Sequence, residues 1–144
     1  MHQGWTITAA ILAGLAVGMG AFAAHGLDKV FTEKYAGQTR TVGGETVPLA
    51  KKFLGDFKTG AEYQMYHALG LLGVAALAAQ RPSRSAHVAG WCLLLGCVFF
   101  SGSLYILTLT GVTKWGAVTP IGGLFFLLGW FAMAVSASGK SKLA

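Results

Sequence analysis

The chain has 144 residues, of which 54% are hydrophobic and only 11% are charged. A soluble domain carries about a quarter of its residues as Asp, Glu, Lys or Arg, so this composition excludes an ordinary water-soluble protein. The formal net charge of +6 comes without a basic stripe or interleaved aromatic residues, so we expect no nucleic acid partner and attribute the cations to anionic membrane lipids.

Charged residues are absent from four stretches of at least 18 residues each: 1–27, 63–80, 85–113 and 115–139. Apolar runs of this length are typical of transmembrane helices. The sequence therefore predicts an all-α membrane protein, a single membrane domain of four transmembrane helices over residues 1–144. The predicted spans are about residues 5–24, 61–79, 88–110 and 120–136.

The first predicted span carries Ala10, Gly14 and Gly18 at four-residue spacing. Small residues at this spacing let a second helix approach closely. Because glycine is frequent throughout the chain, we expect this stripe to pack against another helix of the same chain rather than against a second copy.

A long polar connection, residues 28–60, follows the first span and is predicted to lie outside the membrane. Its middle, "YAGQTRTVGGETVP", is rich in Gly and Thr and indicates a loop or a short hairpin. In "LAKKFLGDFKTG", the apolar residues Leu49, Phe53, Leu54 and Phe57 fall on one helical face. This pattern favours a short helix in the membrane interface, although a helix packed on the protein itself would show it as well.

The remaining spans are joined by the short turns "QRPSRS" and "GVTKWG", so we expect spans two, three and four to be antiparallel neighbours. An even number of spans places both termini on one side. A strict Lys and Arg count favours the loop side as cytoplasmic, whereas the dense positive charge of the short segments near the termini favours the opposite. We predict a multi-pass protein of the inner (plasma) membrane with cytoplasmic termini.

Three segments in order carry a family resemblance: "GAFAAHGL", "TGAEYQMYHALGLL", and "FSGSLYILTLTG" followed by "TPIGGLFFLLGW". Together they resemble the domain-of-unknown-function family 423, small four-span inner-membrane proteins of bacteria with a relative in animals. The resemblance covers nearly the whole chain and implies the four-span topology, but it implies no activity. The stretch 36–49 looks like an insertion relative to shorter members.

The predicted topology places six polar or aromatic side chains in the half of the bundle next to the long loop. The candidates for ligand binding are His25, Glu62, Tyr63, Tyr66, His67 and Tyr105. Polar groups at membrane depth are costly unless they pair or line a cavity. We therefore expect one polar pocket, open toward the loop side, for a small ligand such as a lipid headgroup or a quinone.

Each candidate also has a structural explanation. Thr59 and Glu62 have the spacing of a capping box, so Glu62 could serve the helix start. The tyrosines fit an aromatic belt at the interface, and His67 fits a core histidine bonded to a tyrosine, serine or carbonyl. His25 fits the end of the first helix, where it can bond the last carbonyls. Tyr105 shares a helical face with Ser101 and Thr108, which could hold helices together.

No nucleophile motif, paired intramembrane carboxylates or metal-ligand spacing occurs in the sequence, so we expect no catalytic residues, no metal and no cofactor. Haem ligation by His25 and His67, or a metal site that adds Glu62, has no supporting motif. The sequence favours a non-enzymatic membrane protein, either an accessory subunit or a small-ligand binder. Its expected partners are membrane lipids and a larger membrane complex or a homo-oligomer. The alternative is a small oligomeric transporter or proton-linked carrier, which the lack of internal similarity between the two helical hairpins disfavours.

Overall fold

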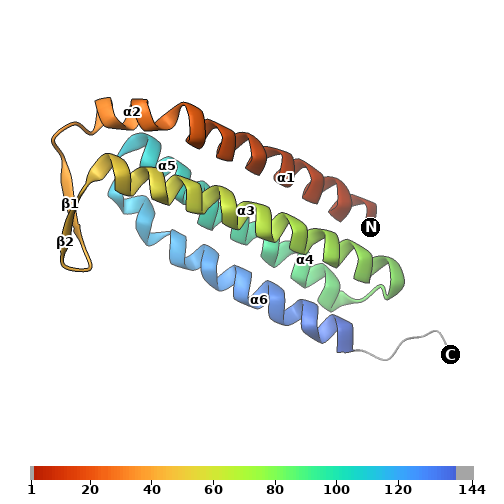
Figure 1. The fold of residues 1–144 in the computed structure, drawn as a ribbon. Coiled ribbons are helices and arrows are strands. Elements are labelled where there is room, and N and C mark those ends of the chain that lie inside the picture. Colours follow the sequence, from red (N-terminus) through yellow and green to blue (C-terminus); the bar gives the residue numbers. More distant parts are fainter. Residues whose placement is uncertain (1, 139–144) are drawn as a thin grey trace.

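The computed structural model describes residues 2–138 as a bundle of long helices with a β-hairpin at one end (Figure 1). The elements in chain order are α1 (His2–His25), α2 (Leu27–Lys34), β1 (Thr39–Val42), β2 (Glu45–Pro48), α3 (Leu49–Gln80), α4 (Arg84–Gly96), the π-helical turn η1 (Cys97–Ser101), α5 (Gly102–Thr110), the 3₁₀ turn η2 (Thr113–Ala117) and α6 (Thr119–Ser138). Three helical segments are long and apolar enough to cross a membrane: His2–His25, Arg84–Thr110 and Thr113–Ser138.

The bundle has two ends, which we call the hairpin end and the terminal end. At the hairpin end, α1 passes into α2, α3 begins, and α5 passes into α6 through η2 (Figure 1). At the terminal end lie the start of α1, the end of α6 and the turn between α3 and α4. Consecutive long helices therefore alternate in direction, with α1 packed on α3 and α4 packed on α6.

Helix α3 runs without a break from Leu49 to Gln80. The prediction of a separate short interfacial helix in the connection 28–60 was therefore wrong. The physical reason is periodicity: the buried residues Phe53, Phe57, Ala61 and Gln64 recur every three or four positions, so one apolar face continues from the connection into the second half of the helix.

Because α3 is unbroken here, Thr59 and Glu62 do not form the predicted capping box. Thr59 and Glu62 lie in the interior of α3, about three turns after its first residue. Backbone amides at these positions already bond within the helix, so a carboxylate at Glu62 has no helix start to cap. An explanation for Glu62 must come from its surroundings.

The segment between α2 and α3 forms an antiparallel hairpin in which Arg40 faces Val47 and Val42 faces Glu45 across the two strands. Gly43 and Gly44 occupy its turn with φ angles of 58° and 88°. Two consecutive positive φ values match the twist of a tight hairpin and are readily adopted by glycine. The "GG" pair thus determines where this chain reverses.

Two apolar clusters hold the helices together. The cluster at the hairpin end joins α2, α3 and α5 and includes Leu27, Phe31, Phe53 and Phe57, each no more than 1% exposed. Within it, the Tyr35 hydroxyl donates a hydrogen bond of 2.6 Å to the Thr108 carbonyl. The second cluster lies closer to the terminal end and joins α1, α3, α4 and α6. The β-hairpin is therefore connected to a tightly packed part of the bundle.

Many large apolar side chains on the outside of the bundle are exposed, among them Ile7, Ile11, Leu127 and Phe131. A soluble protein rarely leaves so much apolar surface uncovered, whereas a lipid-facing surface requires it. Helices α1 and α6 each have 17% of their apolar window buried in the bundle. The outer surface therefore has the character of a membrane protein.

The stripe formed by Ala10, Gly14 and Gly18 lies on this exposed surface. A Cβ atom added at Gly14 or Gly18 would meet nothing within 4 Å. The prediction that the stripe packs inside the chain was wrong, because α1 turns Trp5, Ala9, Ala16 and Ala23 toward the bundle instead.

Glycines of α6 allow its close approach to the preceding helix. A Cβ at Gly122 would lie 2.3 Å from the Phe100 amide nitrogen, so α6 touches backbone at the π-helical turn. Close to this contact, the hydroxyls of Ser103 and Thr119 lie 2.8 Å apart and share a hydrogen bond. We call α4, η1 and α5 together the third long helix, Arg84–Thr110. The start of α6 is therefore positioned directly against the second half of this helix.

Candidate functional site

Four of the six predicted site residues are exposed: Tyr63, which also packs on other rings as described below, and His25, Glu62 and Tyr66. His25 is the last residue of α1, and the Tyr66 side chain is 55% exposed. Glu62 lines a shallow cavity of about 300 Å³ between α1 and α3 together with Lys58. The side chains of His25, Glu62 and Tyr66 point to the surface of the bundle rather than into a shared pocket.

His67 is buried in a stack of aromatic rings. Its ring lies 3.3 Å from that of Phe126 with an interplanar angle of 7°, and Trp130 lies 6.0 Å away. The neighbouring Tyr63 stacks on Phe100 at 4.6 Å. Nδ1 of His67 lies 2.6 Å from the Tyr63 carbonyl, which can only accept, so Nδ1 carries the proton. This geometry agrees with the interpretation of His67 as a core histidine bonded to a carbonyl.

Tyr105 belongs to a polar chain through the bundle. Its hydroxyl donates to Oε1 of Gln64 at 3.1 Å, and Nε2 of Gln64 donates to the Leu12 carbonyl at 2.8 Å. Gln64 is 6% exposed and joins α1, α3 and α5. Gln64 was not among the predicted site residues. Its signal was an uncharged polar residue on the same face of α3 as Phe57 and Ala61.

The six predicted residues therefore separate into an exposed set, an aromatic stack around His67 and a hydrogen-bonded chain through Tyr105. Among residues 2–138, no group of three or more His, Cys, Asp and Glu side chains lies close enough to hold a metal ion. In the same part of the chain, the Ser101 hydroxyl is the one buried side-chain polar atom without a hydrogen-bond partner. It lies in the π-helical turn next to the contact with α6.

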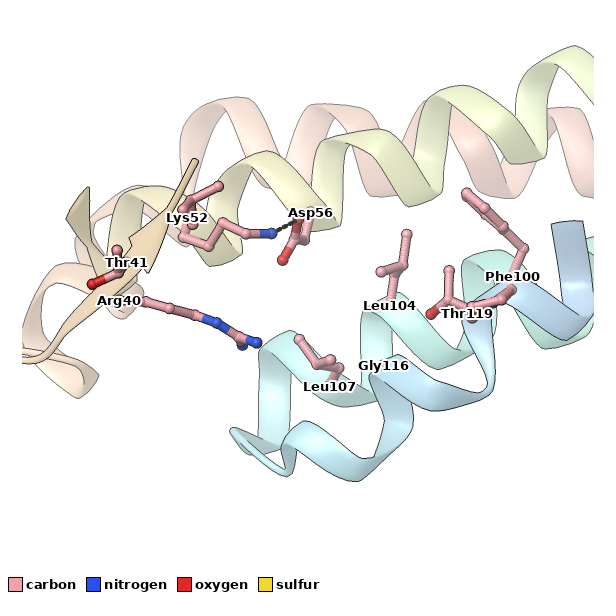
Figure 2. Close-up of a pocket in the computed structure, with 11 residues that line it drawn as sticks. Arg40, Thr41, Lys52, Asp56, Phe100, Leu104, Leu107, Gly116 and Thr119 are labelled. Carbon is pink, nitrogen blue, oxygen red and sulfur yellow. Dashed lines mark hydrogen bonds and ion pairs between the residues drawn. The ribbon is translucent and has the colours of Figure 1, made fainter. Parts of the chain in front are cut away.

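A larger cavity lies at the hairpin end, and we call it the hairpin cavity (Figure 2). Its volume is about 530 Å³. The hairpin, the first turns of α3, the end of the third long helix and the start of α6 all contribute to it. Its lining includes three charged side chains and three large apolar side chains: Arg40, Lys52, Asp56, Phe100, Leu104 and Leu107.

The hairpin cavity is lined by more positive than negative side chains. Lys52 and Asp56, one turn apart on α3, form an ion pair across the cavity wall (Figure 2). Arg40 extends from β1 toward Leu107, and within the described residues 2–138 it makes no ion pair (Figure 2). The cavity therefore has one uncompensated cation at its rim.

The opposite wall of the cavity is apolar. Phe100, Leu104 and Leu107 contribute side chains from η1 and α5, and the adjacent Thr119 is already bonded to Ser103. Binding sites commonly combine an apolar lining with a few placed polar groups. The arrangement suits a ligand that has an anionic head and an apolar body. Arg40 could not be identified from the sequence, because the strand that carries it shares a cavity with residues of α5 only in the folded chain.

Comparison with known proteins adds family membership. Residues 19–123 match the family described as "Protein of unknown function (DUF423)". The chain is 43% identical over 132 residues to the UPF0382 membrane protein YwdK of Bacillus subtilis, covering 91% of this chain and 93% of that protein.

A second relative, the UPF0382 inner membrane protein YgdD of Escherichia coli K12, is 40% identical over 131 residues, covering 91% of this chain and 86% of that protein. A UPF0382 membrane protein of Staphylococcus epidermidis is 42% identical over 130 residues, covering 90% and 91%. No solved structure matches the chain significantly. The chain therefore belongs to the DUF423 family, a family of membrane proteins of unknown function.

Proposed function

We propose that this protein is a non-enzymatic, four-span membrane protein that binds an anionic phospholipid in the hairpin cavity. The observation that carries the proposal is Arg40, a cation without a carboxylate partner in the described chain, held opposite an apolar wall. Membrane lipids are the expected partner, and the ligand class follows from the charge of this cavity.

The length of α3 indicates how deep the hairpin cavity lies in the membrane. Helix α3 has 32 residues, about 48 Å at 1.5 Å per residue, whereas the hydrocarbon core is about 30 Å thick. Residues 61–80 are enough to cross this core, which leaves the first turns of α3 outside it. Lys51, Lys52, Asp56 and Lys58 all fall in these turns. Such a placement makes α3 the fourth span and puts the hairpin cavity at the level of the lipid headgroups.

Arg40 is better suited than Lys52 to bind the phosphate of a lipid headgroup. A guanidinium presents several N–H donors in a plane and binds phosphate oxygens in pairs. Lys52 is less available, because its ammonium already bonds Asp56. Asp56 in turn repels a second anion, so the phosphate belongs on the Arg40 side of the cavity. A zwitterionic lipid offers the same phosphate but adds a cation close to Arg40, which favours phosphatidylglycerol or another anionic lipid.

The apolar wall of the hairpin cavity can accommodate the acyl chain of the lipid. Phe100, Leu104 and Leu107 lie on successive turns of the third long helix and form an apolar track below Arg40. A lipid whose phosphate contacts the hairpin can lay its chain along this track. Because Arg40 lies in the stretch 36–49, binding would also give a role to the segment that resembles an insertion. With cytoplasmic termini, the lipid would come from the outer leaflet.

Native mass spectrometry of the detergent-purified protein tests the proposal directly. Equal amounts of phosphatidylglycerol and phosphatidylcholine are added, and bound lipid is compared for the wild type, Arg40→Gln and Arg40→Lys. A lost charge-assisted hydrogen bond of about 1.5 kcal/mol corresponds to about a tenfold loss of affinity. We expect this loss of phosphatidylglycerol in Arg40→Gln and a smaller loss in Arg40→Lys, which keeps the charge but not the planar donors.

Lys29→Gln is the matched control. Lys29 is an exposed cation of α2 at the same end of the bundle and does not line the hairpin cavity. If Lys29→Gln reduces lipid binding as much as Arg40→Gln, the attraction is a general effect of net charge and the assigned site is wrong. Recovery of the protein solely with a larger complex, and without lipid, would favour an accessory subunit instead.

A further inference from the structure

A separate cavity at the terminal end lies between the first turns of α1 and one side of α4. It has a volume of about 370 Å³ and is lined by Gly4, Trp5 and Thr8 from α1 and by His87, Trp91 and Leu94 from α4. None of these residues was a predicted site residue, and the cavity lies at the opposite end of the bundle from Arg40. We call it the tryptophan cavity.

Its back wall is fixed by packing. Trp5 is 7% exposed, and a Cβ atom added at Gly90 would lie 2.6 Å from its ring. The indole therefore rests on the backbone of α4. Trp91, which is 57% exposed, meets Trp5 edge-on with ring centroids 5.6 Å apart and an interplanar angle of 85°. Two indoles at right angles form a preformed corner whose open face can receive a flat ring.

His87 supplies a directed donor to this corner. The Trp5 indole nitrogen, which can only donate, lies 3.4 Å from Nδ1 of His87. Nδ1 must therefore accept, and the neutral imidazole carries its proton on Nε2. Within residues 2–138 this Nε2–H has no hydrogen-bond partner. The indole bond thus sets both the tautomer and the orientation of the ring.

The Thr8 hydroxyl is a second available donor. Thr6, Thr108 and Thr110 each donate to the carbonyl four residues earlier in their own helix. Thr8 makes no such bond, nor any other within the described residues. A hydroxyl that leaves its own helix unbonded at a cavity wall can donate to a ligand.

The lining residues named above carry no formal charge when His87 is neutral. Such a site favours a neutral ligand with hydrogen-bond acceptors over a phosphate or an ammonium group. Its position near the start of two membrane helices makes it reachable from the lipid phase. We propose that the tryptophan cavity binds a membrane-soluble quinone, with one ring carbonyl accepting from both the His87 Nε2–H and the Thr8 hydroxyl and with the ring lying on Trp91.

The test measures retention of a short-tailed quinone by the full-length protein in mild detergent. Decylubiquinone is equilibrated with the protein by gel filtration, and the bound quinone is extracted and quantified by absorbance. We expect about one quinone per chain in the wild type and about a tenfold weaker binding in Thr8→Val and in Trp91→Leu, since each removes one direct contact. Thr8→Val leaves the Trp5–His87 bond intact, so it keeps the test valid if His87→Phe fails to fold.

Trp115→Leu is the matched control, because Trp115 is a partly exposed tryptophan at the hairpin end. It should bind quinone like the wild type, as should Arg40→Gln, whose site lies at the other end. Quinone retention no greater than that of empty micelles would overturn the proposal. Equal losses in Trp115→Leu and Trp91→Leu would do the same, as would a phospholipid that occupies the site and is not displaced by quinone.

Discussion

Replacement of Gly122 by alanine tests the packing that positions α6. A Cβ at Gly122 would lie 2.3 Å from the amide nitrogen and 2.7 Å from the Cα atom of Phe100. Both neighbours are backbone, so no side-chain rotation can relieve the contact. The adjacent Gly123 is the matched control, because a Cβ there meets nothing within 4 Å.

The magnitude follows from the geometry. Carbon atoms pack at about 3.5–4.0 Å, so α6 would have to move by about 1 Å to admit the methyl group. Overpacking of this kind costs about 1–3 kcal/mol, whereas the gain in helix propensity from Gly to Ala is the same at both positions and cancels. At roughly 3 °C per kcal/mol, the two variants should differ in Tm by about 3–9 °C, with Gly122→Ala the less stable.

Thermal unfolding in detergent, followed with a thiol-reactive fluorogenic dye, measures this difference. Both variants carry Cys92→Ser, because Cys92 is a partly exposed free thiol. The remaining thiol, Cys97, lies in the same π-helical turn as Phe100, is 4% exposed and reacts only when the packing opens. Equal midpoints for Gly122→Ala and Gly123→Ala, or a higher midpoint for Gly122→Ala, would show that α6 does not touch the backbone of η1. The close approach inferred from the glycines would then be wrong.

The other predictions concern buried polar groups. Gln64→Leu should lower the free energy of unfolding by about 1–3 kcal/mol because it leaves the Tyr105 hydroxyl unpaired, and adding Tyr105→Phe should recover part of the loss in denaturation curves. His67→Ala should lower Tm by several degrees while Glu62→Gln leaves it unchanged, since the first is buried and the second exposed; the opposite order would contradict the aromatic stack. Burial raises the pKa of Tyr35 above its usual value, so the unfolded phenol ionises first and stability should fall as pH rises beyond about 10. Tyr35→Phe should abolish that part of the alkaline loss in pH-dependent melting.

Several features could be predicted from local sequence because local physics decides them. The charge-free stretches predicted helices where α1, α4 to α5 and α6 lie. Gly111, with a φ angle of 78°, ends α5 where the "TG" pair places the stop. The Gly43–Gly44 pair turns the hairpin. Each depends on backbone conformations or hydropathy within a few residues.

The rotation of each helix could not be predicted in the same way. In a soluble protein the buried face is apolar and the outer face polar, so the pattern identifies the core. In a membrane protein the lipid-facing surface is also apolar, and this signal vanishes. The exposed stripe through Gly14 and Gly18, expected to pack inside, is the clearest consequence.

The candidate site shows the same limit. The polar stretch "EYQMYH" correctly indicated that a part of α3 carries polar side chains. These side chains point in different directions around the helix: Gln64 and His67 are buried, while Glu62 and Tyr66 face outward. Arg40 carried no local signal, because its importance depends on a cavity that β1 shares with α5 in the folded chain. Contacts between segments about 70 residues apart in the chain are invisible to any local pattern.

The sequence by itself determined that this protein lies in a membrane, that its segments are helical and where most of them turn, because solvation and backbone geometry act on neighbouring residues. Tertiary packing alone decided that Arg40 faces an apolar wall, that Gly14 and Gly18 face outward, and that Trp5 of α1 contacts His87 of α4. These features arise where side chains of different helices pack against one another. Close packing depends on which side chains and glycines meet, and that information is shared between distant parts of the chain.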